Sequence, residues 1–201
     1  MHALIVVAHH DPQSLTHNVA RQVGASAAAA GHTYEIADLY TENFDPRYGV
    51  DDNPVHRVGA TPPADVLAEQ ARIDRADALV LVFPVYWWSF PALLMGWVDR
   101  VFVNGWALDY TEATNTVKKL GHLNVHLLAI GAADEGVFDR HGYATAMRTQ
   151  IDHGIFDYCG AQVLTSELLL DSESGAAEQH LETARQLGRQ LFVSMKAAET
   201  A

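Results

Sequence analysis

The stretch of sequence that decides the fold lies near the start of the chain and reads HALIVVAHHDPQSLT over residues 2–16. Its first seven residues form a short aliphatic and β-branched run that ends in polar residues and a proline, a pattern typical of a strand buried on both faces. Apolar residues then recur at every fourth position from Leu15 to Ala27, which predicts a helix over residues 14–30 with Ser14 as its N-cap.

The same alternation of strand and helix continues along the chain. Further strands are predicted over residues 32–38, 77–84, 123–131 and 161–170, and further helices over residues 63–75, 91–103, 143–158 and 176–195. Parallel strands need helical crossovers, which cover both faces of a sheet. We therefore expect an α/β fold with a doubly wound, five-stranded parallel sheet, and the 201 residues fit one domain, residues 1–201.

Composition limits the class of partner. Lys and Arg number 13 against 25 Asp and Glu, and the resulting net charge of −12 would repel nucleic-acid phosphates and anionic membranes. Cys159 is the one cysteine and lies in an apolar run, so we expect a buried, unreactive thiol. Because the sequence also lacks a basic leader and a long apolar stretch, we expect a soluble, cytoplasmic protein that binds neither nucleic acid nor membrane.

Ligands of such sheets bind beyond the carboxyl ends of the strands, so the loops there are the first candidates for a site. The loop 9–16 brings hydroxyl and backbone N–H groups to a helix start, which suits a phosphate, although Ser14 can equally be an ordinary N-cap. Tyr86, Trp87 and Trp88 follow the third strand. Their rings suit either stacking on a flat conjugated ligand or packing in a subunit interface.

The loop after the fourth strand, residues 130–142, is rich in small residues and would let a planar ligand approach the backbone. His141, near its end, could exchange a proton at neutral pH. A metal site and a serine hydrolase are not predicted, because the sequence has neither HExxH nor a cysteine pair nor G-x-S-x-G. The long segment 39–62, with its prolines and glycines, is either a functional flap or a dimer arm.

The block FPVYWWSFPALLMGWVDRVF, residues 83–102, resembles the signature F-P-x-x-W-[FW]-x-x-P-A-x-[LM]-K-G-W-x-[DE]-R-V-[FL] of the quinone reductase family that includes DT-diaphorase. Residues 3–9, 38–46, 107–110 and 154–164 are also similar to that family, so the resemblance covers most of the chain. It implies a flavodoxin-like fold with strand order 2-1-3-4-5. It also implies a flavin-dependent NAD(P)H:quinone oxidoreductase that transfers two electrons as hydride by a ping-pong mechanism, with FAD or alternatively FMN as cofactor.

The resemblance implies roles for individual residues. Those that would hold the flavin phosphates are His9, Ser14, Leu15 and Thr16. Those that would line the flavin ring are Pro84, Val85, Tyr86, Trp87, Trp88, Ile130, Gly131 and Ala132. Those that would face the substrate are Trp87, Trp88, Phe138 and His141, with His141 as the catalytic group. The positions that would complete the pocket of a second subunit are Leu108, Tyr110 and Tyr158, which implies a homodimer with shared active sites.

The sequence also departs from the family pattern. The residues Ile-Gly-Ala-Ala at 130–133 replace two threonines and two glycines, and Phe138 lies near the place of a tyrosine that acts with the histidine. Met95 replaces a lysine. Two other functions therefore stay open: a flavodoxin-like regulatory or electron-carrier subunit, and an azo- or nitro-reductase. We further expect the helix 91–103 and the segment 107–110 in the dimer interface, because the apolar residues of this helix exceed what one buried stripe needs.

Overall fold

A computed structural model describes residues 1–111 and 114–193 and confirms the predicted α/β fold. Its main sheet is parallel and has the order β2-β1-β3-β6-β7. The strands are β1 (His2–Val7), β2 (Thr33–Asp38), β3 (Ala78–Pro84), β6 (Asn124–Ile130) and β7 (Gln162–Leu169). Since β6 and β7 are the fourth and fifth strands of this sheet, the expected order 2-1-3-4-5 is also confirmed.

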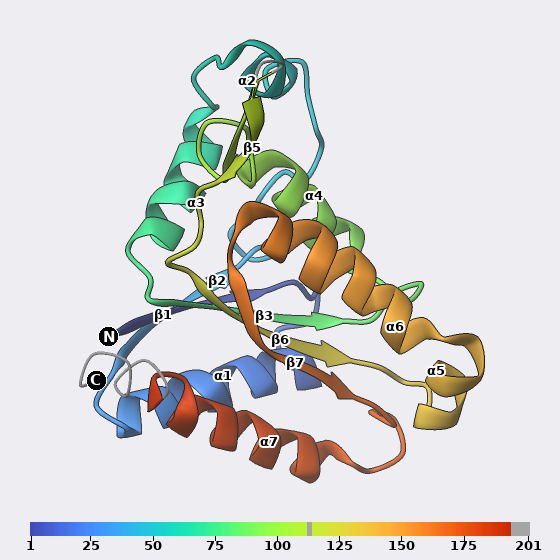
Figure 1. Cartoon of the computed structure of the whole chain (residues 1–201). Helices are drawn as coiled ribbons and strands as arrows, with labels where there is room; N and C mark the ends of the chain where they lie inside the picture. The colour runs from blue at the N-terminus through green and yellow to red at the C-terminus, as the bar shows by residue number, and fades with distance from the viewer. Residues whose placement is uncertain (112–113, 194–201) are drawn as a thin grey trace.

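Helices cover both faces of the sheet (Figure 1). On one face lie α1 (Leu15–Ala29) and α7 (Ala177–Gln190), and on the other lie α3 (Ala64–Asp74), α4 (Ala92–Val101) and α6 (Tyr143–Met147). Alternate strand residues supply the two cores: Leu4 and Val6 pack beneath α3 and α4, whereas Ile5 and Val7 pack against α1. The apolar runs in the sequence thus reflect burial on both faces.

The helix predicted over residues 143–158 is present, but its winding differs from the prediction. After α6 the chain continues as a π-helix, η1 (Arg148–Asp157). The buried residues there are Ile151 and Phe156, five apart, whereas Ile155 is only partly buried. The wider turn makes Phe156 the next fully buried residue after Ile151, while Ile155 is partly buried and packs against the same core. The end of the predicted helix 176–195 lies outside the described residues.

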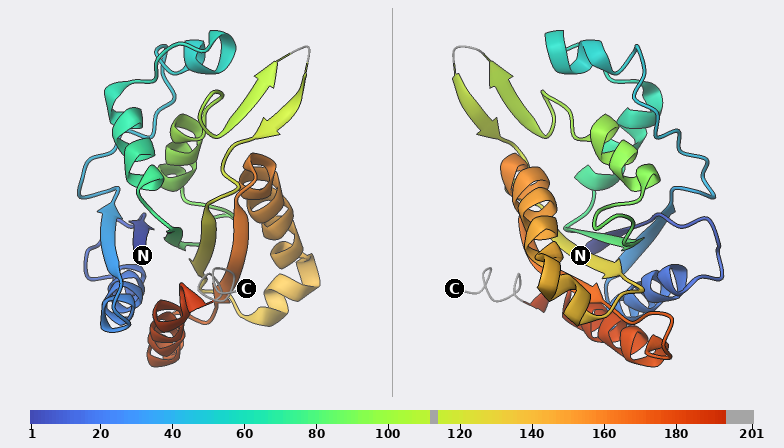
Figure 2. Two further views of the ribbon diagram at one scale, coloured as in Figure 1. Left: turned by 60° about the vertical axis from the view of Figure 1, so that its left-hand side comes forward. Right: turned by 90° about the vertical axis from the view of Figure 1, so that its right-hand side faces the viewer.

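Three elements lie where no regular structure was predicted. The segment 39–62 contains α2 (Asn53–Val58), and a hairpin of β4 (Leu108–Thr111) and β5 (Thr114–Lys118) projects from the body of the molecule (Figure 2). A third element, α5 (Glu135–His141), occupies the loop after β6. Its N-cap is Asp134, whose side chain accepts the backbone N–H of Val137, and it ends at Gly142 with φ +68°.

The prediction that α4 carries more apolar residues than its own chain can bury is wrong. Trp97, Val98, Val101 and Phe102 are all buried within their own chain, at most 9% exposed. The indole Nε1 of Trp97 also donates to Glu69 Oε2 at 2.8 Å. This helix therefore gives no reason to expect a dimer contact. Among the residues that the structure describes, no helix is long and apolar enough to cross a membrane.

Candidate active site

Two consecutive tryptophans form the tip of a tight turn directly after β3. The backbone N–H of Tyr86 donates to the carbonyl of Ser89 at 3.1 Å, and that of Ser89 donates to Tyr86 at 3.0 Å. Between them, Trp87 has φ +49° and Trp88 has φ +59°. Two positive φ angles within a two-residue hairpin are typical of a type I′ turn, which normally uses asparagine and glycine. The turn leaves Trp87 92% exposed and Trp88 partly buried.

The turn borders an apolar hollow of about 220 Å³, here named the tryptophan pocket. Its lining residues are Val85, Trp87, Trp88, Gly131, Ala132, Ala133 and Phe138. The walls come from the loops after β3 and β6, which are joined where Val85 N–H donates to the Ile130 carbonyl at 2.8 Å. At Gly131 a Cβ atom would lie 2.9 Å from Leu170 Cδ2, a methyl group at the end of a flexible side chain, so a larger residue there would require the Leu170 side chain to shift.

Most of the residues predicted to line a flavin ring therefore lie around one pocket. Five of the predicted ring-lining residues and Phe138 surround the tryptophan pocket. Pro84 and Ile130 are buried at the ends of β3 and β6, behind this lining, and Tyr86 is 47% exposed on the turn. A pocket with apolar rings on one side and small residues on the other can accept one edge of a flat conjugated molecule.

Three aromatic rings stack beside the tryptophan pocket, and sequence reasoning missed the central one. The ring of Tyr143 lies 3.7 Å from that of Trp88 at an interplanar angle of 10°, and 5.2 Å from that of His141 at 29°. Tyr143 therefore separates His141 from Trp88, and His141 does not line the pocket. Phe138 meets Trp88 edge to face at 5.3 Å. The available signal was an aromatic residue directly after His141 and Gly142 at a predicted helix start.

The loop before α1 holds the residues predicted to bind phosphate. The Ser14 side chain caps α1 by accepting the backbone N–H of His17 at 3.2 Å, as predicted for an N-cap. His9 is partly buried and accepts the backbone N–H of Asp11 at 3.0 Å. Its pKa is lowered by burial and by the neighbouring His10 and His17. Ser14 and Leu15 are partly exposed, but Thr16 is only 2% exposed, so its side chain offers little surface to a ligand.

The three residues predicted to face a second subunit also come together, in a different place. They lie around a hollow of about 310 Å³, here named the tyrosine pocket, which is lined by His56, Phe102, Asn104, Leu108, Tyr110 and Tyr158. Tyr110 and Tyr158 are about half exposed, at 57% and 49%. The tyrosine and tryptophan pockets share no lining residue. Within one chain, these residues therefore do not complete the tryptophan pocket.

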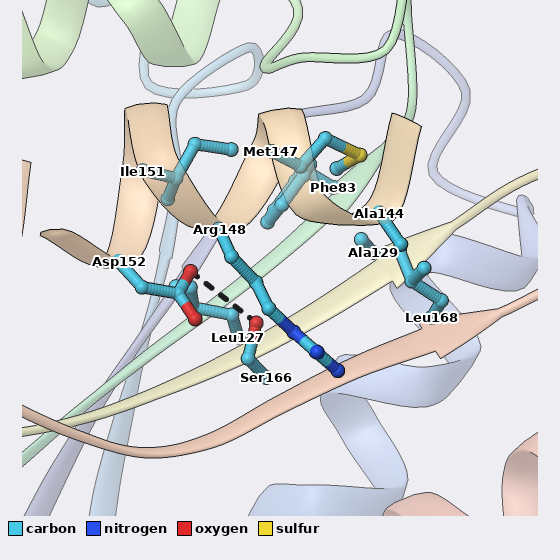
Figure 3. Close-up of a pocket in the computed structure, with 10 residues that line it drawn as sticks. All are labelled: Phe83, Leu127, Ala129, Ala144, Met147, Arg148, Ile151, Asp152, Ser166 and Leu168. Atoms are coloured by element: carbon cyan, nitrogen blue, oxygen red, sulfur yellow. Dashed lines mark hydrogen bonds between the residues drawn. The ribbon is translucent and has the colours of Figure 1, made fainter. Parts of the chain in front are cut away.

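A small cavity beneath α6 and η1 is a poor candidate for a site (Figure 3). Its volume is about 20 Å³, enough for one water molecule. Asp152 lies at its edge, where burial raises the pKa of the carboxyl group and Ser166 donates a hydrogen bond to it at 3.3 Å. The cavity has room for neither a cofactor nor a substrate.

Cys159 is buried, as predicted, at 4% exposure. Burial raises the pKa of its thiol to about 11, although the positive charge of Lys118 opposes this shift. The thiol is therefore protonated and unreactive at neutral pH.

Comparison with known proteins places the chain in a family. The family model described as "Flavodoxin-like fold" matches residues 1–191. The chain is 33% identical over 190 residues to NAD(P)H dehydrogenase [quinone] 1 of Rattus norvegicus, a match that covers 83% of this chain and 68% of the relative. It is 28% identical over 196 residues to ribosyldihydronicotinamide dehydrogenase [quinone] of Mus musculus, covering 88% and 84%.

Solved structures agree with this assignment. The NAD(P)H:quinone oxidoreductase from Methanothermobacter marburgensis superposes with a TM-score of 0.87 at 31% identity, covering 95% of this chain and 98% of its own. The azoreductase AzrA has a TM-score of 0.72 at 20% identity, a similarity of fold alone. The chain therefore belongs to the flavodoxin-like family, among the NAD(P)H:quinone oxidoreductases.

Proposed function

We propose that this chain is a flavin-dependent enzyme that transfers a hydride from NAD(P)H to quinones by a ping-pong mechanism. The observation that carries the proposal is the tryptophan pocket, an apolar, ring-lined hollow at the carboxyl edge of the sheet, where doubly wound proteins bind their ligands. The relatives named as quinone oxidoreductases support the reaction class.

The lining of the tryptophan pocket suits one edge of an isoalloxazine ring. One wall consists of Gly131, Ala132 and Ala133, whose side chains are no larger than a methyl group, so a planar ring can approach the backbone there. On the opposite wall, Trp87 and Trp88 offer indole faces and edges to a flat ligand. When bound, the flavin supplies the redox chemistry, accepting hydride from NAD(P)H and passing it to the quinone. The residues of the chain orient the rings and exclude water from them.

A proton donor lies next to this pocket. The Tyr143 ring is stacked against Trp88, and the His141 imidazole is stacked against Tyr143 in turn. Tyr143 is therefore the ring in contact with the pocket lining, and His141 is linked to the pocket through it. The predicted lack of a phenol, inferred from Phe138, is thus compensated by Tyr143. We propose that His141 is the catalytic group that holds or releases the proton, and that Tyr143 shares this role.

The phosphate end of the cofactor is assigned to the loop before α1. Ser14 and the first backbone N–H groups of α1 face this loop, and His9 lies beside them. A helix start with its positive dipole end favours a phosphate. Either FAD or FMN meets these requirements.

We also propose a homodimer in which the tyrosine pocket of one subunit borders the tryptophan pocket of the other. Leu108, Tyr110 and Tyr158 form a half-exposed aromatic and aliphatic surface, as subunit contacts require. Light scattering at micromolar concentration should give twice the chain mass, and a monomer mass would contradict the dimer.

The enzyme proposal is tested by the colour of the purified protein and by the loss of that colour when NADH or NADPH is added. We expect a yellow protein that bleaches on anaerobic addition of NADH or NADPH and regains its colour with menadione, and mass spectrometry of the released cofactor identifies FAD or FMN. A preparation that takes up neither flavin would refute the proposal. A flavin that NAD(P)H reduces only slowly would indicate the electron-carrier alternative, and faster turnover with an azo dye than with menadione would indicate an azoreductase.

A further inference from the structure

A partly buried chain of three polar side chains links the start of α1 to the end of β2. The Ser14 hydroxyl lies 3.0 Å from Nδ1 of His17, and Nε2 of His17 lies 3.0 Å from Oδ2 of Asp38. The imidazole is 5% exposed. Capping of α1 requires only the Ser14 oxygen, which accepts the His17 backbone N–H. The buried imidazole and the carboxylate therefore need a separate explanation.

Asp38 fixes the direction of these hydrogen bonds. Burial acts to raise the pKa of this carboxyl group, but hydrogen bonds from Thr41 and His17 outweigh burial and lower it. The carboxylate is ionised at neutral pH and can only accept, so Nε2 of His17 carries a proton. A neutral imidazole then presents an unprotonated Nδ1 to Ser14. In this state the one hydroxyl proton of Ser14 is donated to His17, and none remains for a ligand.

Protonation of His17 reverses the bond to Ser14. The imidazolium donates from Nδ1 as well, so the Ser14 oxygen accepts from both the imidazolium and the His17 backbone N–H. An oxygen with two lone pairs can accept both bonds and still donate its own proton outward. The Ser14 hydroxyl is then free to bind an anion, and a positive charge lies behind it.

We propose that His17 is a positioning residue for the cofactor phosphate, and that phosphate binding takes up one proton at His17. Asp38 holds the imidazole, the imidazole sets the direction of the Ser14 hydroxyl, and Ser14 contacts the phosphate. This inference rests on the proposed function, because it uses the contact of Ser14 with the flavin phosphates. Proton uptake and anion binding are then linked, so each strengthens the other.

Other titratable groups face His17 from the loop after β1. The His9 ring meets the His17 ring edge-on at 6.2 Å, and His10 is stacked on His9 at 4.6 Å. Asp11 adds a negative charge beside His9. The pKa of His9 is lowered, so His9 is neutral at pH 7 and adds no competing positive charge there. From β2 the facing group is the carboxylate of Asp38, 3.0 Å from Nε2 of His17.

The test compares flavins with and without a phosphate. Kd values of FMN and of riboflavin are measured by fluorescence quenching from pH 5.5 to 8.0 for the wild type and for His17→Asn, whose amide can occupy the place of Nδ1 but does not titrate. The FMN phosphate itself titrates near pH 6, so the wild type is compared with the variant at each pH. His10→Asn is the matched control, an exposed imidazole of the same loop outside the Ser14–His17–Asp38 chain.

We expect the FMN affinity of the wild type, relative to His17→Asn, to fall at least about fivefold between pH 5.5 and 8.0, the lower end of ordinary linkage effects. The same ratio for riboflavin should stay constant, and His10→Asn should behave like the wild type. A constant FMN ratio, or an equal slope with riboflavin, would overturn the inference while leaving the flavin enzyme intact.

A second measurement needs neither flavin nor a folded variant. The ¹⁵N NMR titration of His17 in the wild-type protein is recorded with and without inorganic phosphate. We expect the Nε2-protonated tautomer at high pH, and a titration midpoint that moves to higher pH with phosphate. The opposite tautomer, or a midpoint unmoved by saturating phosphate, would overturn the inference whatever becomes of the proposed function.

Discussion

Replacing Arg100 by methionine should lower the free energy of unfolding by about 3–5 kcal/mol, the usual cost of removing one partner from a buried ion pair. Arg100 lies on α4 and is 6% exposed. Its Nε donates to Asp52 Oδ1 at 3.0 Å, and the Asp52 side chain is also buried. One Nη1 proton reaches the Asp45 carbonyl at 2.8 Å. Arg100 therefore holds the segment 45–52 against α4.

Most of this cost comes from Asp52. The other carboxylate that contacts Arg100, Asp65, is half exposed, so its pairing contributes at most about 1 kcal/mol. Asp52 cannot reach water without movement of its segment, and methionine leaves its charge uncompensated. Set against a total stability of about 5–15 kcal/mol, a loss of this size would unfold a measurable fraction of the protein or release the segment.

Urea denaturation followed by tryptophan fluorescence measures the effect in the wild type and three variants. Arg100→Met with Asp52→Asn should be more stable than Arg100→Met alone, because the second change removes the buried charge. Arg189→Met is the control, since Arg189 and its partner Glu182 are about half exposed and solvent screens their ion pair, so its loss should change the stability little. The reasoning is refuted by a cost below about 1 kcal/mol for Arg100→Met, or by a double variant no more stable than the single one.

The remaining predictions concern one histidine, one tryptophan and the cysteine. Burial lowers the pKa of His126 to about 4, so the unfolded chain binds the proton first. The free energy of unfolding should therefore reach its maximum above about pH 6.5 and decrease by up to about 3 kcal/mol toward pH 4. Urea denaturation of His126→Gln should show a smaller decrease over the same pH range. Trp87→Asn should keep or raise stability by up to about 1 kcal/mol but weaken flavin binding at least about tenfold, measured by denaturation and by flavin titration; a clear loss of stability contradicts it. Cys159 should react slowly with DTNB at pH 8 in the native protein and rapidly in urea, and equal rates would show that the thiol is not protected.

The sheet could be predicted from the sequence because its strands carry a strong local signal. Residues 78–84 are an unbroken apolar run, and all of them are buried in the structure. The element α5 could not be predicted in the same way. It is short, its first residues follow glycine and alanine, and only Phe138 of its seven residues is buried, so no apolar period marks it.

The residues of the site could be predicted from the sequence, but their arrangement in space could not. Trp87, Trp88 and Gly131 were named from their positions after strands, and those positions place them in one pocket. The positive φ angles of the two tryptophans and the stacking of Tyr143 depend on how separate loops meet, which no local pattern records. The apolar residues of α4 led to a wrong prediction of surplus apolar surface for a related reason. Apolar residues all round a helix indicate burial, but they do not say whether the same chain or a partner provides it.

The backbone strain of this protein is informative about its site. Among the described residues, positive φ outside glycine occurs at Asn43, Trp87, Trp88 and Asp171. Asparagine and aspartate tolerate that conformation, whereas each tryptophan costs about 1–2 kcal/mol there. Folding alone would favour asparagine and glycine in the turn, and a 92% exposed indole returns little packing energy at Trp87. Stability therefore does not explain the residue types of this turn, whereas the proposed role, in which the turn presents two rigid rings to a flat ligand in the tryptophan pocket, would explain them.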